Sequence, residues 1–486
     1  MFEISLVFSA VGAMLLIGAF SNKLSSKFNV PILLLFLLFG MFAGQGHTPG
    51  NLEFSAVSIA GTVAMCFILF SGGLNTQFTT IRPVMLPGGV LATAGVILTC
   101  IFFAVCARGI FYKELSFSEC MLLGAMISST DAAAVFGILS GKSVGLKGKL
   151  RPILELESGS NDPMAYFLTL FMIEIILGKS QLGITSVFLL VYRMAGGIIL
   201  GILVGMFGKL LYKTKLEYEG LYFVFDIAVV LLAYGLTEGV KANGMMACYV
   251  CGITMNHCRF NYQKSITRFS DGVSWLMQVI LFTTLGIFVD VYKLPEISWK
   301  GLLLAAILLF IARPAAVFLT LAGQSFSWKE KLLISWVGLR GAAPIVLATF
   351  PLSYSLGEAK LYFNLIFFMV LVSMLVQGMT LMPLAKLLKL DKPFSGRERL
   401  PLELESTPAT SGHEMKEFIV PQDTSFAGKT IAELSLPQGV LITLIRRGKN
   451  LLQPNGKTEI HSGDGLLIMG THENLRKVQE EYFLED

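Results

Sequence analysis

Long apolar segments separated by short polar loops fill the first 388 residues of this chain. A helix needs about 20 apolar residues to cross the hydrocarbon core of a bilayer. By this measure the pattern predicts an α-helical polytopic membrane protein with 13 membrane-spanning helices. The expected spans are residues 4–21, 29–45, 55–72, 83–107, 118–141, 152–177, 184–211, 221–239, 244–257, 270–291, 299–322, 332–350 and 361–388.

The hydrophobic pattern changes after residue 388. It divides the chain into a transmembrane domain (1–388), a linker (389–412) and a cytosolic domain (413–486). The linker is polar, contains proline and has no periodicity. The last part alternates short apolar runs with glycine-containing turns, which predicts a small α+β domain. Its size is close to the lower limit for folding alone, so we expect it to dimerise. The expected strands are 415–420, 440–446, 450–453 and 466–469, and the expected helices are 430–434 and 472–481.

The number and the distribution of charged residues support a membrane protein and indicate its orientation in the bilayer. Only 15% of the residues are charged, against about 25% in an ordinary soluble domain. Residues 1–20 lack a basic segment and a small-residue cleavage motif, so we expect them to form the first helix and not a cleaved signal peptide. Lys and Arg are concentrated in the loops after odd-numbered spans, which predicts an external N-terminus and a cytoplasmic C-terminal domain. The net charge of +5 therefore requires no nucleic-acid partner.

Two patterns of small residues are interpreted as packing features. Gly197, Gly201 and Gly205 repeat at four-residue spacing, which is typical of close helix packing in membranes. Cys248 and Cys251 have neither a second cysteine pair nor a histidine cluster, so packing thiols are expected and not a metal site. The seven cysteines lie in or beside membrane segments and give no disulfide framework.

The sixth span carries an acid in a polar setting. Ser158, Asn161 and Asp162 are three and four residues apart, so their side chains can share one helix face. An acid inside a membrane is a functional-site hypothesis by default. Burial disfavours a bare carboxylate, so either a proton or a metal cation would neutralise Asp162. If the proton and the cation compete for this one carboxylate, the binding of one releases the other, and the protein exchanges the two ions. The alternative is a structural acid in a salt bridge.

The fifth span contains Thr130 and Asp131 among small and hydroxyl residues, which allow a helix to break inside a membrane protein. Thr130 would offer an oxygen atom to the cation. Asp131 would either balance the positive end of a half-helix or hold Asn161. The alternative is a Ser/Thr patch that only packs helices.

The twelfth span contains a counterpart, the Gly/Pro-interrupted run 338–346. Interrupted helices at corresponding positions indicate a transporter site between inverted repeats. Spans 1–6 and 8–13 would then be two inverted six-helix repeats with broken crossing helices. Arg340 is expected to pair with Glu157, with Glu155 as second choice. Three other charged residues are expected to be structural: Glu174, Asp226 and Arg313.

Three motifs of this chain resemble the signature of a known family. They are Thr130-Asp131, Glu157-Ser158-x-x-Asn161-Asp162-Pro163 and Gly338-Leu339-Arg340-Gly341-Ala342. Over residues 1–388 the chain resembles the monovalent cation:proton antiporter-1 family, in the branch of NhaP proteins and sodium/hydrogen exchangers. This implies a homodimer with a dimerisation domain and a mobile core that works by an elevator-like movement.

The resemblance also implies residue roles. Asp162, Ser158 and Thr130 would bind K⁺ or Na⁺ and protons, supported by Asp131 and Asn161. Glu157 and Arg340 would form a structural ion pair. An Asn before the transporting Asp goes with electroneutral one-for-one exchange in this family. Many sodium-selective relatives carry an acid in the third span, where this chain has Phe70-Ser71-Gly72-Gly73-Leu74, so the preference for Na⁺ is not implied.

The tail resembles the C-terminal subdomain of regulators of K⁺ conductance, the TrkA-C type, through its hairpins and the turn at Gly463-Asp464-Gly465. The resemblance implies a small cytosolic regulator, a cyclic dinucleotide or nucleotide, and favours K⁺ as substrate. Cyclic di-AMP is the candidate suggested by Gram-positive relatives. No enzymatic cofactor is expected.

The sequence therefore predicts a K⁺(Na⁺)/H⁺ antiporter of the cytoplasmic membrane whose tail sets its activity. A ligand-gated cation channel with the same tail is the main alternative, but no Thr-Val-Gly-Tyr-Gly-like filter occurs in the chain. A hydrolase using Ser158 or Ser160 with Asp162 would need a base, and these two spans contain no histidine or lysine.

Overall fold

The computed structural model consists of two compact units, one made of Met1–Phe260 and Ser265–Gly396 and the other of Asn261–Lys264 and Arg397–Asp486. Each unit is described by itself. The structure describes residues 9, 12–13, 15–16, 32–44, 51–111, 114–140, 144–181, 183–214, 218, 220–256, 263–289, 294–393, 413–420, 428–434, 436–448, 450–471, 473–475 and 477–478.

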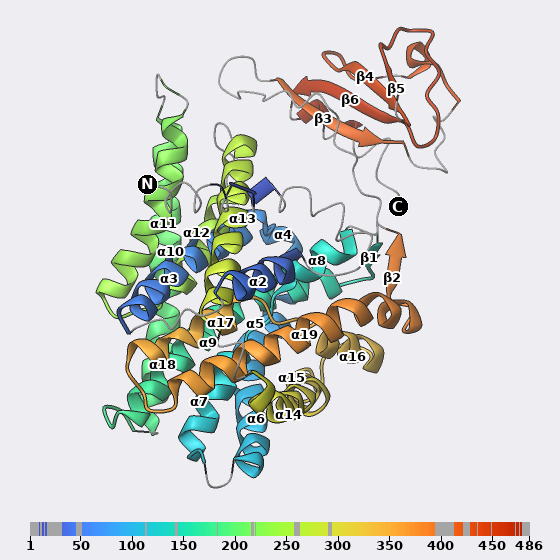
Figure 1. Ribbon diagram of the computed structural model, residues 1–486. Helices are drawn as coiled ribbons and strands as arrows, with labels where there is room; N and C mark the ends of the chain where they lie inside the picture. The colour runs from blue at the N-terminus through green and yellow to red at the C-terminus, as the bar shows by residue number, and fades with distance from the viewer. Residues whose placement is uncertain are drawn as a thin grey trace. The chain divides into compact units, whose positions relative to one another are not determined.

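The first unit is helical (Figure 1). Its α-helices are α2 (Ile32–Ala43), α3 (Asn51–Asn75), α4 (Phe78–Ile81), α5 (Met85–Val90), α6 (Val96–Ile110), α7 (Phe117–Ile127), α8 (Ala132–Ser140), α9 (Leu150–Ile176), α10 (Ile184–Lys213), α11 (Leu221–Gly239), α12 (Gly244–Asn256), α13 (Gln263–Ile287), α14 (Leu294–Ile307), α15 (Arg313–Thr320), α16 (Trp328–Trp336), α17 (Ala342–Leu347), α18 (Thr349–Ser353) and α19 (Ala359–Leu387). Three short elements interrupt them: a 3₁₀ turn η1 (Arg82–Val84) and two π-helical turns, η2 (Leu91–Gly95) and η4 (Leu308–Ala312).

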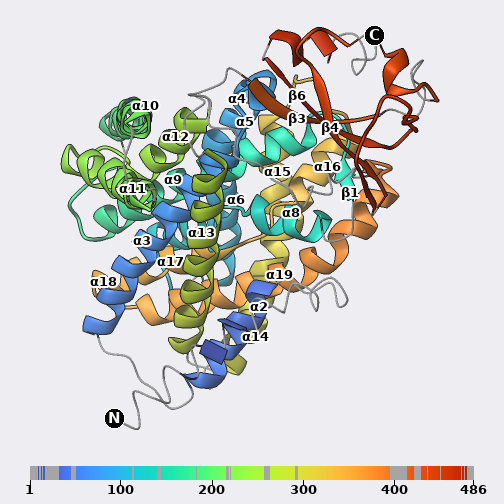
Figure 2. The ribbon, with the colours of Figure 1, turned by 90° about the horizontal axis from the view of Figure 1, so that it is seen from above.

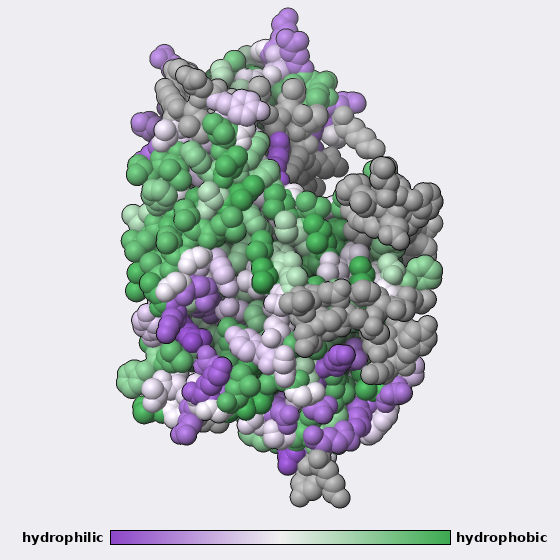
Figure 3. All heavy atoms as spheres, turned by 60° about the vertical axis from the view of Figure 1, so that its left-hand side comes forward, coloured by the Kyte–Doolittle hydropathy of each residue, from purple (hydrophilic) through white to green (hydrophobic). Residues whose placement is uncertain are grey.

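Seven helical stretches of the described residues are long and apolar enough to cross a membrane. The predicted first span, 4–21, lies largely outside the described residues. Two predicted spans are not continuous: α7 and α8 divide the fifth, and α16, α17 and α18 divide the twelfth. On the face that carries α10 and α11, hydrophobic side chains form a broad band with hydrophilic residues above and below it (Figure 3). That band is the surface a lipid bilayer would cover.

Close backbone contacts hold the helices together where glycine removes the side chain. α12 packs against both α10 and α3 (Figure 2). The predicted packing role of Gly197, Gly201 and Gly205 is confirmed, because an added Cβ would meet α12 or the residue before it at 2.6–2.8 Å. On the other side of α12, a Cβ on Gly73 of α3 would lie 2.3 Å from the carbonyl oxygen of Tyr249.

A two-stranded antiparallel sheet joins distant parts of the helical unit. β1 (Val144–Leu146) lies between α8 and α9, and β2 (Asp391–Pro393) follows α19. Val144 pairs with Pro393 and Leu146 with Asp391. The backbone N–H of Lys147 also donates to the carbonyl oxygen of Leu390 at 3.0 Å. Residues 391–393, which the sequence assigns to the linker, are thus a strand of this sheet.

The second unit contains a four-stranded antiparallel sheet of order β3-β6-β4-β5. Its strands are β3 (His413–Ile419), β4 (Leu441–Arg447), β5 (Asn450–Leu452) and β6 (Gly465–Thr471). The short helix expected at 430–434 is a single 3₁₀ turn, Ile431–Glu433. Of the expected closing helix, 473–475 and 477–478 are described and are helical.

An ion pair fixes the turn before β6. The Arg447 guanidinium donates to both carboxylate oxygens of Asp464, at 2.8 Å from Nη2 to Oδ2 and 3.0 Å from Nε to Oδ1. Burial works against the charged carboxylate, but the hydrogen bonds from Arg447 and from the His461 backbone N–H outweigh it and hold the pKa of Asp464 below its usual value. This stabilisation is present above the unfolded-state pKa and is lost as the pH falls through the folded-state pKa.

Adding one methyl group at Gly73 tests the close packing of α3 on α12. Gly73→Ala is expected to lower stability by about 1–3 kcal/mol, because the helices must separate to admit the Cβ. Gly72→Ala is the matched control, since a Cβ there meets no atom within 4 Å. Thermal unfolding in detergent measures both, and equal midpoints would contradict the packing.

Candidate functional site

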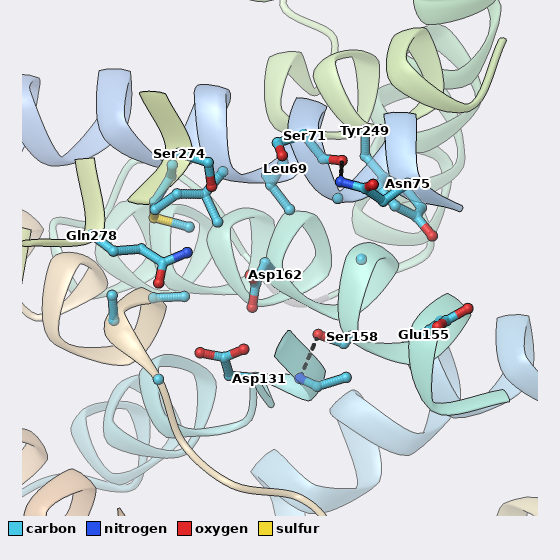
Figure 4. Close-up of a pocket in the computed structure, with 18 of the residues that line it drawn as sticks. Leu69, Ser71, Asn75, Asp131, Glu155, Ser158, Asp162, Tyr249, Ser274 and Gln278 are labelled. Atoms are coloured by element: carbon cyan, nitrogen blue, oxygen red, sulfur yellow. Dashed lines mark hydrogen bonds between the residues drawn. The ribbon is translucent and has the colours of Figure 1, made fainter. Parts of the chain in front are cut away.

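A cavity of about 560 Å³ lies in the helical unit, between α3, α12 and α13 on one side and the interrupted helices with α9 on the other. Figure 4 shows Ser71 and Asn75 of α3 on one wall and Asp131, Ser158 and Asp162 on the other. Four residues of the predicted cation site therefore line one cavity: Thr130, Asp131, Ser158 and Asp162.

The break between α7 and α8 follows from residues whose side chains satisfy the local backbone. Ser128 ends α7 and its hydroxyl donates to the carbonyl oxygen of Ala125 at 2.7 Å. Asp131 begins α8, and its Oδ1 accepts the backbone N–H of Ala134 at 3.1 Å. Such short polar side chains offer the backbone an alternative to the helical ladder. Of the two roles considered for Asp131, the structure shows the one at the half-helix N-terminus.

The break between α16 and α17 lies directly against the first. The backbone N–H of Asp131 donates to the carbonyl oxygen of Leu339 at 2.7 Å. A Cβ on Gly341 would lie 2.2 Å from Asp131 Oδ2, so the close approach requires glycine. Pro344 falls in the first turn of α17, where its missing N–H costs no intrahelical bond. Two non-helical segments thus satisfy each other inside the membrane unit.

Arg340 holds the two breaks together. Its Nη1 donates to the carbonyl oxygens of Ser128 at 2.7 Å and Ser129 at 2.5 Å, and the residue is fully buried. The last carbonyls of a helix have no intrahelical donors and attract a cation. This explains why Arg340 points at the end of α7.

The predicted pair between Glu157 and Arg340 is wrong. Glu157 instead forms its ion pair with Arg313 of α15, and both side chains are buried. The reason is that Arg340 is already engaged by the carbonyls that end α7, while α15 brings a second guanidinium to α9. Glu155, the second choice for Arg340, pairs with Arg151 at 2.8 Å at the cavity. Both buried arginines were visible in the sequence, but their spacing does not reveal which helix each one faces.

Ser158 and Asn161 tie α9 to the first break. Ser158 Oγ accepts the backbone N–H of Ala132 at 2.9 Å and donates to the carbonyl oxygen of Thr130 at 3.0 Å. Asn161 Nδ2 donates to Thr130 Oγ1 at 2.6 Å. Thr130, Ser158 and Asp162 line the cavity, whereas Asn161 is buried behind them.

One oxygen of the Asp162 carboxylate is left without a partner. The buried Oδ1 accepts no hydrogen bond from any described residue, and the same holds for Asn161 Oδ1, while Ser129 lies next to the carboxylate. No ion pair joins Asp162 to a described basic residue, although Arg340 lies nearby. The expected alternative of a salt-bridged Asp162 therefore finds no support. Carboxylate and amide oxygen atoms of this kind are ligands that hard cations prefer.

Charged groups of both signs surround Asp162. Arg340 lies close to Arg313, Glu157 and Asp162, and Asp131 lies close to Asp162.

The opposite wall was not foreseen from the sequence. Six polar residues of this wall come from α3, α12 and α13: Ser71, Asn75, Tyr249, Asp271, Ser274 and Gln278. Their only sequence signal is a polar stripe in the tenth predicted span, where Asp271, Ser274 and Gln278 follow helical spacing.

The remaining candidates lie outside the cavity lining. Asp226 is buried and accepts hydrogen bonds from Ser270 and Tyr212. Glu174 lies 3.7 Å from Arg193. Cys248 and Cys251 are buried, and the described part of the chain contains no group of three or more His, Cys, Asp or Glu residues able to hold a metal.

A polytopic helical unit in which two broken helices meet beside an unpartnered acid defines a secondary transporter. The sodium/hydrogen exchanger transmembrane family matches residues 12–387, and the TrkA-C domain matches residues 415–482. The chain belongs to the sodium/hydrogen exchanger family and carries a TrkA-C domain.

Several curated proteins and solved structures are similar to this chain. The K(+)/H(+) antiporter NhaP2 of Shewanella sp. (strain MR-4) is 36% identical over 481 residues, which is 96% of this chain and 82% of the relative. The K(+)/H(+) antiporter NhaP of Alkalimonas amylolytica is 34% identical over 92% of this chain and 78% of its own length. The sodium proton antiporter MjNhaP1 of Methanocaldococcus jannaschii at pH 8 has the same fold, with a TM-score of 0.68, 24% identity and coverage of 79% of this chain and 99% of its own.

A double-mutant cycle tests the corrected ion pair. Arg313→Met should destabilise the protein by about 3–5 kcal/mol, because it leaves the Glu157 charge buried and unpaired. Adding Glu157→Gln should recover part of that loss. The same addition to Arg340→Met should recover less, since Arg340 binds carbonyl oxygens. Thermal unfolding of the singles and doubles gives the coupling, and stronger coupling of Glu157 with Arg340 would reject the assignment.

Proposed function

We propose that this protein is an electroneutral antiporter that exchanges one monovalent cation, primarily K⁺, for one proton. The observation that carries the proposal is the buried Oδ1 of Asp162, which has no partner among the described residues and faces oxygen atoms in a cavity. A buried carboxylate of this kind fits an exchange in which either H⁺ or the cation neutralises it. Thr130 and Ser158 would complete the binding of the cation, with Asp131 and Asn161 in support.

K⁺ is favoured over Na⁺ by two observations. The NhaP2 and NhaP relatives are named K(+)/H(+) antiporters. The third span of this chain has Ser71 and Gly72 at the cavity and no acid in the run 70–74. The Na(+)/H(+) antiporter 1 of Methanocaldococcus jannaschii is 27% identical over 71% of this chain, so Na⁺ is retained as the second substrate.

Alternating access would arise from two inverted repeats within 13 spans. Supporting this, both interrupted helices begin with a Ser-x-x-Glu capping box, Ser116 with Glu119 and Ser327 with Glu330. Both are preceded by a helical stretch with a π-helical turn, η2 or η4. Equivalent breaks then follow in each half. Such paired features are expected when one repeat moves against the other around a central site.

Exchange is expected to depend on the Asp162 carboxylate. Asp162→Asn should abolish K⁺-dependent and Na⁺-dependent proton flux, because the neutral amide has no negative charge to bind either a proton or the cation. Dye-based flux in proteoliposomes, titrated separately with K⁺ and Na⁺, measures this. Gel filtration and thermal unfolding control for folding. Retained exchange would reject Asp162 as the carrier, and single-channel currents at fixed pH would favour a cation channel instead.

The protein is proposed to work as a homodimer in the cytoplasmic membrane, with an external N-terminus and the domain 413–486 in the cytoplasm. Residues 1–388 would form the transporter and 389–412 the linker. The TrkA-C match at 415–482 supports regulation by a small cytosolic ligand, a cyclic dinucleotide such as cyclic di-AMP or a nucleotide. The β1–β2 sheet offers a route, since β2 lies at the start of the path to the tail and β1 lies between α8 and α9, beside the site.

Breaking that sheet should uncouple the tail from transport. Full-length protein and protein truncated after residue 396 are expected to differ in K⁺-dependent flux. Gly145→Pro in the full-length chain should remove this difference, because proline cannot donate to the β-ladder. Gly145→Ala keeps the backbone N–H and is the control. An unchanged difference in Gly145→Pro would exclude the sheet as the route.

A further inference from the structure

The cavity wall opposite Asp162 contains a compact polar cluster that joins α3 to α13. Ser71 Oγ donates to Asp271 Oδ1 at 2.8 Å, and Asn75 Nδ2 donates to the same oxygen at 2.6 Å. Asn75 Nδ2 also lies 3.0 Å from the carbonyl oxygen of Ser71. All three residues line the cavity. Two spans far apart in sequence thus present one carboxylate, one hydroxyl and one amide to the same space.

This geometry leaves oxygen atoms available. Both hydrogen bonds end on Oδ1, so Asp271 Oδ2 and Asn75 Oδ1 face no donor among the residues that the structure describes. No Lys or Arg of the described residues forms an ion pair with Asp271. The neighbouring acid at the cavity, Glu155, is paired with Arg151. Asp271 is therefore the acid of this wall that pairs with no described Lys or Arg.

We propose that Ser71, Asn75 and Asp271, here called the α3–α13 site, bind the incoming alkali cation in partly hydrated form before it reaches Asp162. One carboxylate with two neutral oxygen donors suits a monovalent cation that keeps some water, since Ca²⁺ takes six to eight oxygen ligands. Asn75 and Asp271 are exposed, so water is available to complete the shell. A negative charge in a cleft also raises the local concentration of cations.

A path connects the α3–α13 site to the inner part of the cavity. Asp271, Ser274 and Gln278 are three and four residues apart on α13, and all three line the cavity. Figure 4 shows Ser274 and Gln278 on the wall across from Asp131, with Asp162 between them. The polar stripe therefore leads from the exposed carboxylate of Asp271 toward the carrier. Because α13 and α3 are different helices from α9, the α3–α13 site could stay in place if Asp162 moves during the proposed exchange.

This inference rests on the proposed exchange and predicts a particular kinetic split. Asp271→Asn should raise the KM for K⁺ about tenfold, because the site no longer concentrates the cation. The maximal rate should change by less than about twofold, since Asp162 still carries the charge. Asp271→Glu should restore the KM. Glu358→Gln, which removes an exposed carboxylate outside the cavity lining, is the matched control.

Two outcomes in proteoliposomes would overturn the inference. One is a KM for K⁺ in Asp271→Asn equal to that of the wild type. The other is a lower maximal rate with a lower unfolding temperature and an unchanged KM, which would make the cluster a clamp between α3 and α13 only.

A binding measurement separates this inference from the exchange itself. In the Asp162→Asn background, K⁺ should still raise the unfolding temperature relative to choline, by mass action on the folded state. Adding Asp271→Asn should remove that shift. Equal shifts with and without the Asp271 carboxylate would reject the α3–α13 site, even if the wild type exchanges K⁺ for H⁺. A lost shift would support the site even if no exchange were found.

Discussion

Backbone that leaves the helical ladder inside a membrane must find other partners, and this requirement organises the transporter unit. The two breaks satisfy each other through the bond from the Asp131 N–H to the Leu339 carbonyl oxygen. Arg340 supplies the donors that the end of α7 lacks. An unsatisfied group in hydrocarbon costs several kcal/mol, so the breaks are stable only as a pair. Because the two helices are interrupted at the same place, residues of both breaks line one cavity together with the acids Asp131 and Asp162.

Charge balance then decides which acid is free to act. Glu157 is neutralised by Arg313, and Arg340 is held by carbonyl oxygens. Asp131 caps α8. Asp162 alone has a buried oxygen without a partner among these groups. In the proposed exchange, an arginine bound to this oxygen would leave no free position for a proton or a cation.

The two walls of the cavity come from different sets of helices, which gives the site its asymmetry. Asp162, Ser158 and Thr130 belong to α9 and the first break, whereas Asp271 and Ser71 belong to α13 and α3. Glycine-mediated contact fixes α3 to α12 and α12 to α10. One wall thus belongs to tightly packed helices, and the other belongs to the hydrogen-bonded break and α9.

The sequence by itself determined that the first 388 residues are a helical polytopic membrane unit, that the tail is a small strand-containing domain, and that Thr130, Asp131, Ser158 and Asp162 lie together. These depend on local properties: apolar length, turn chemistry, and side chains three or four residues apart on one helix. It also marked residues 128–131 and 338–346 as places where helices break. Tertiary structure alone decided that Glu157 faces Arg313, that Arg340 caps α7, and that Ser71, Asn75 and Asp271 share a wall. Partners on helices far apart in the chain depend on how the helices pack, and residue spacing contains no information about that.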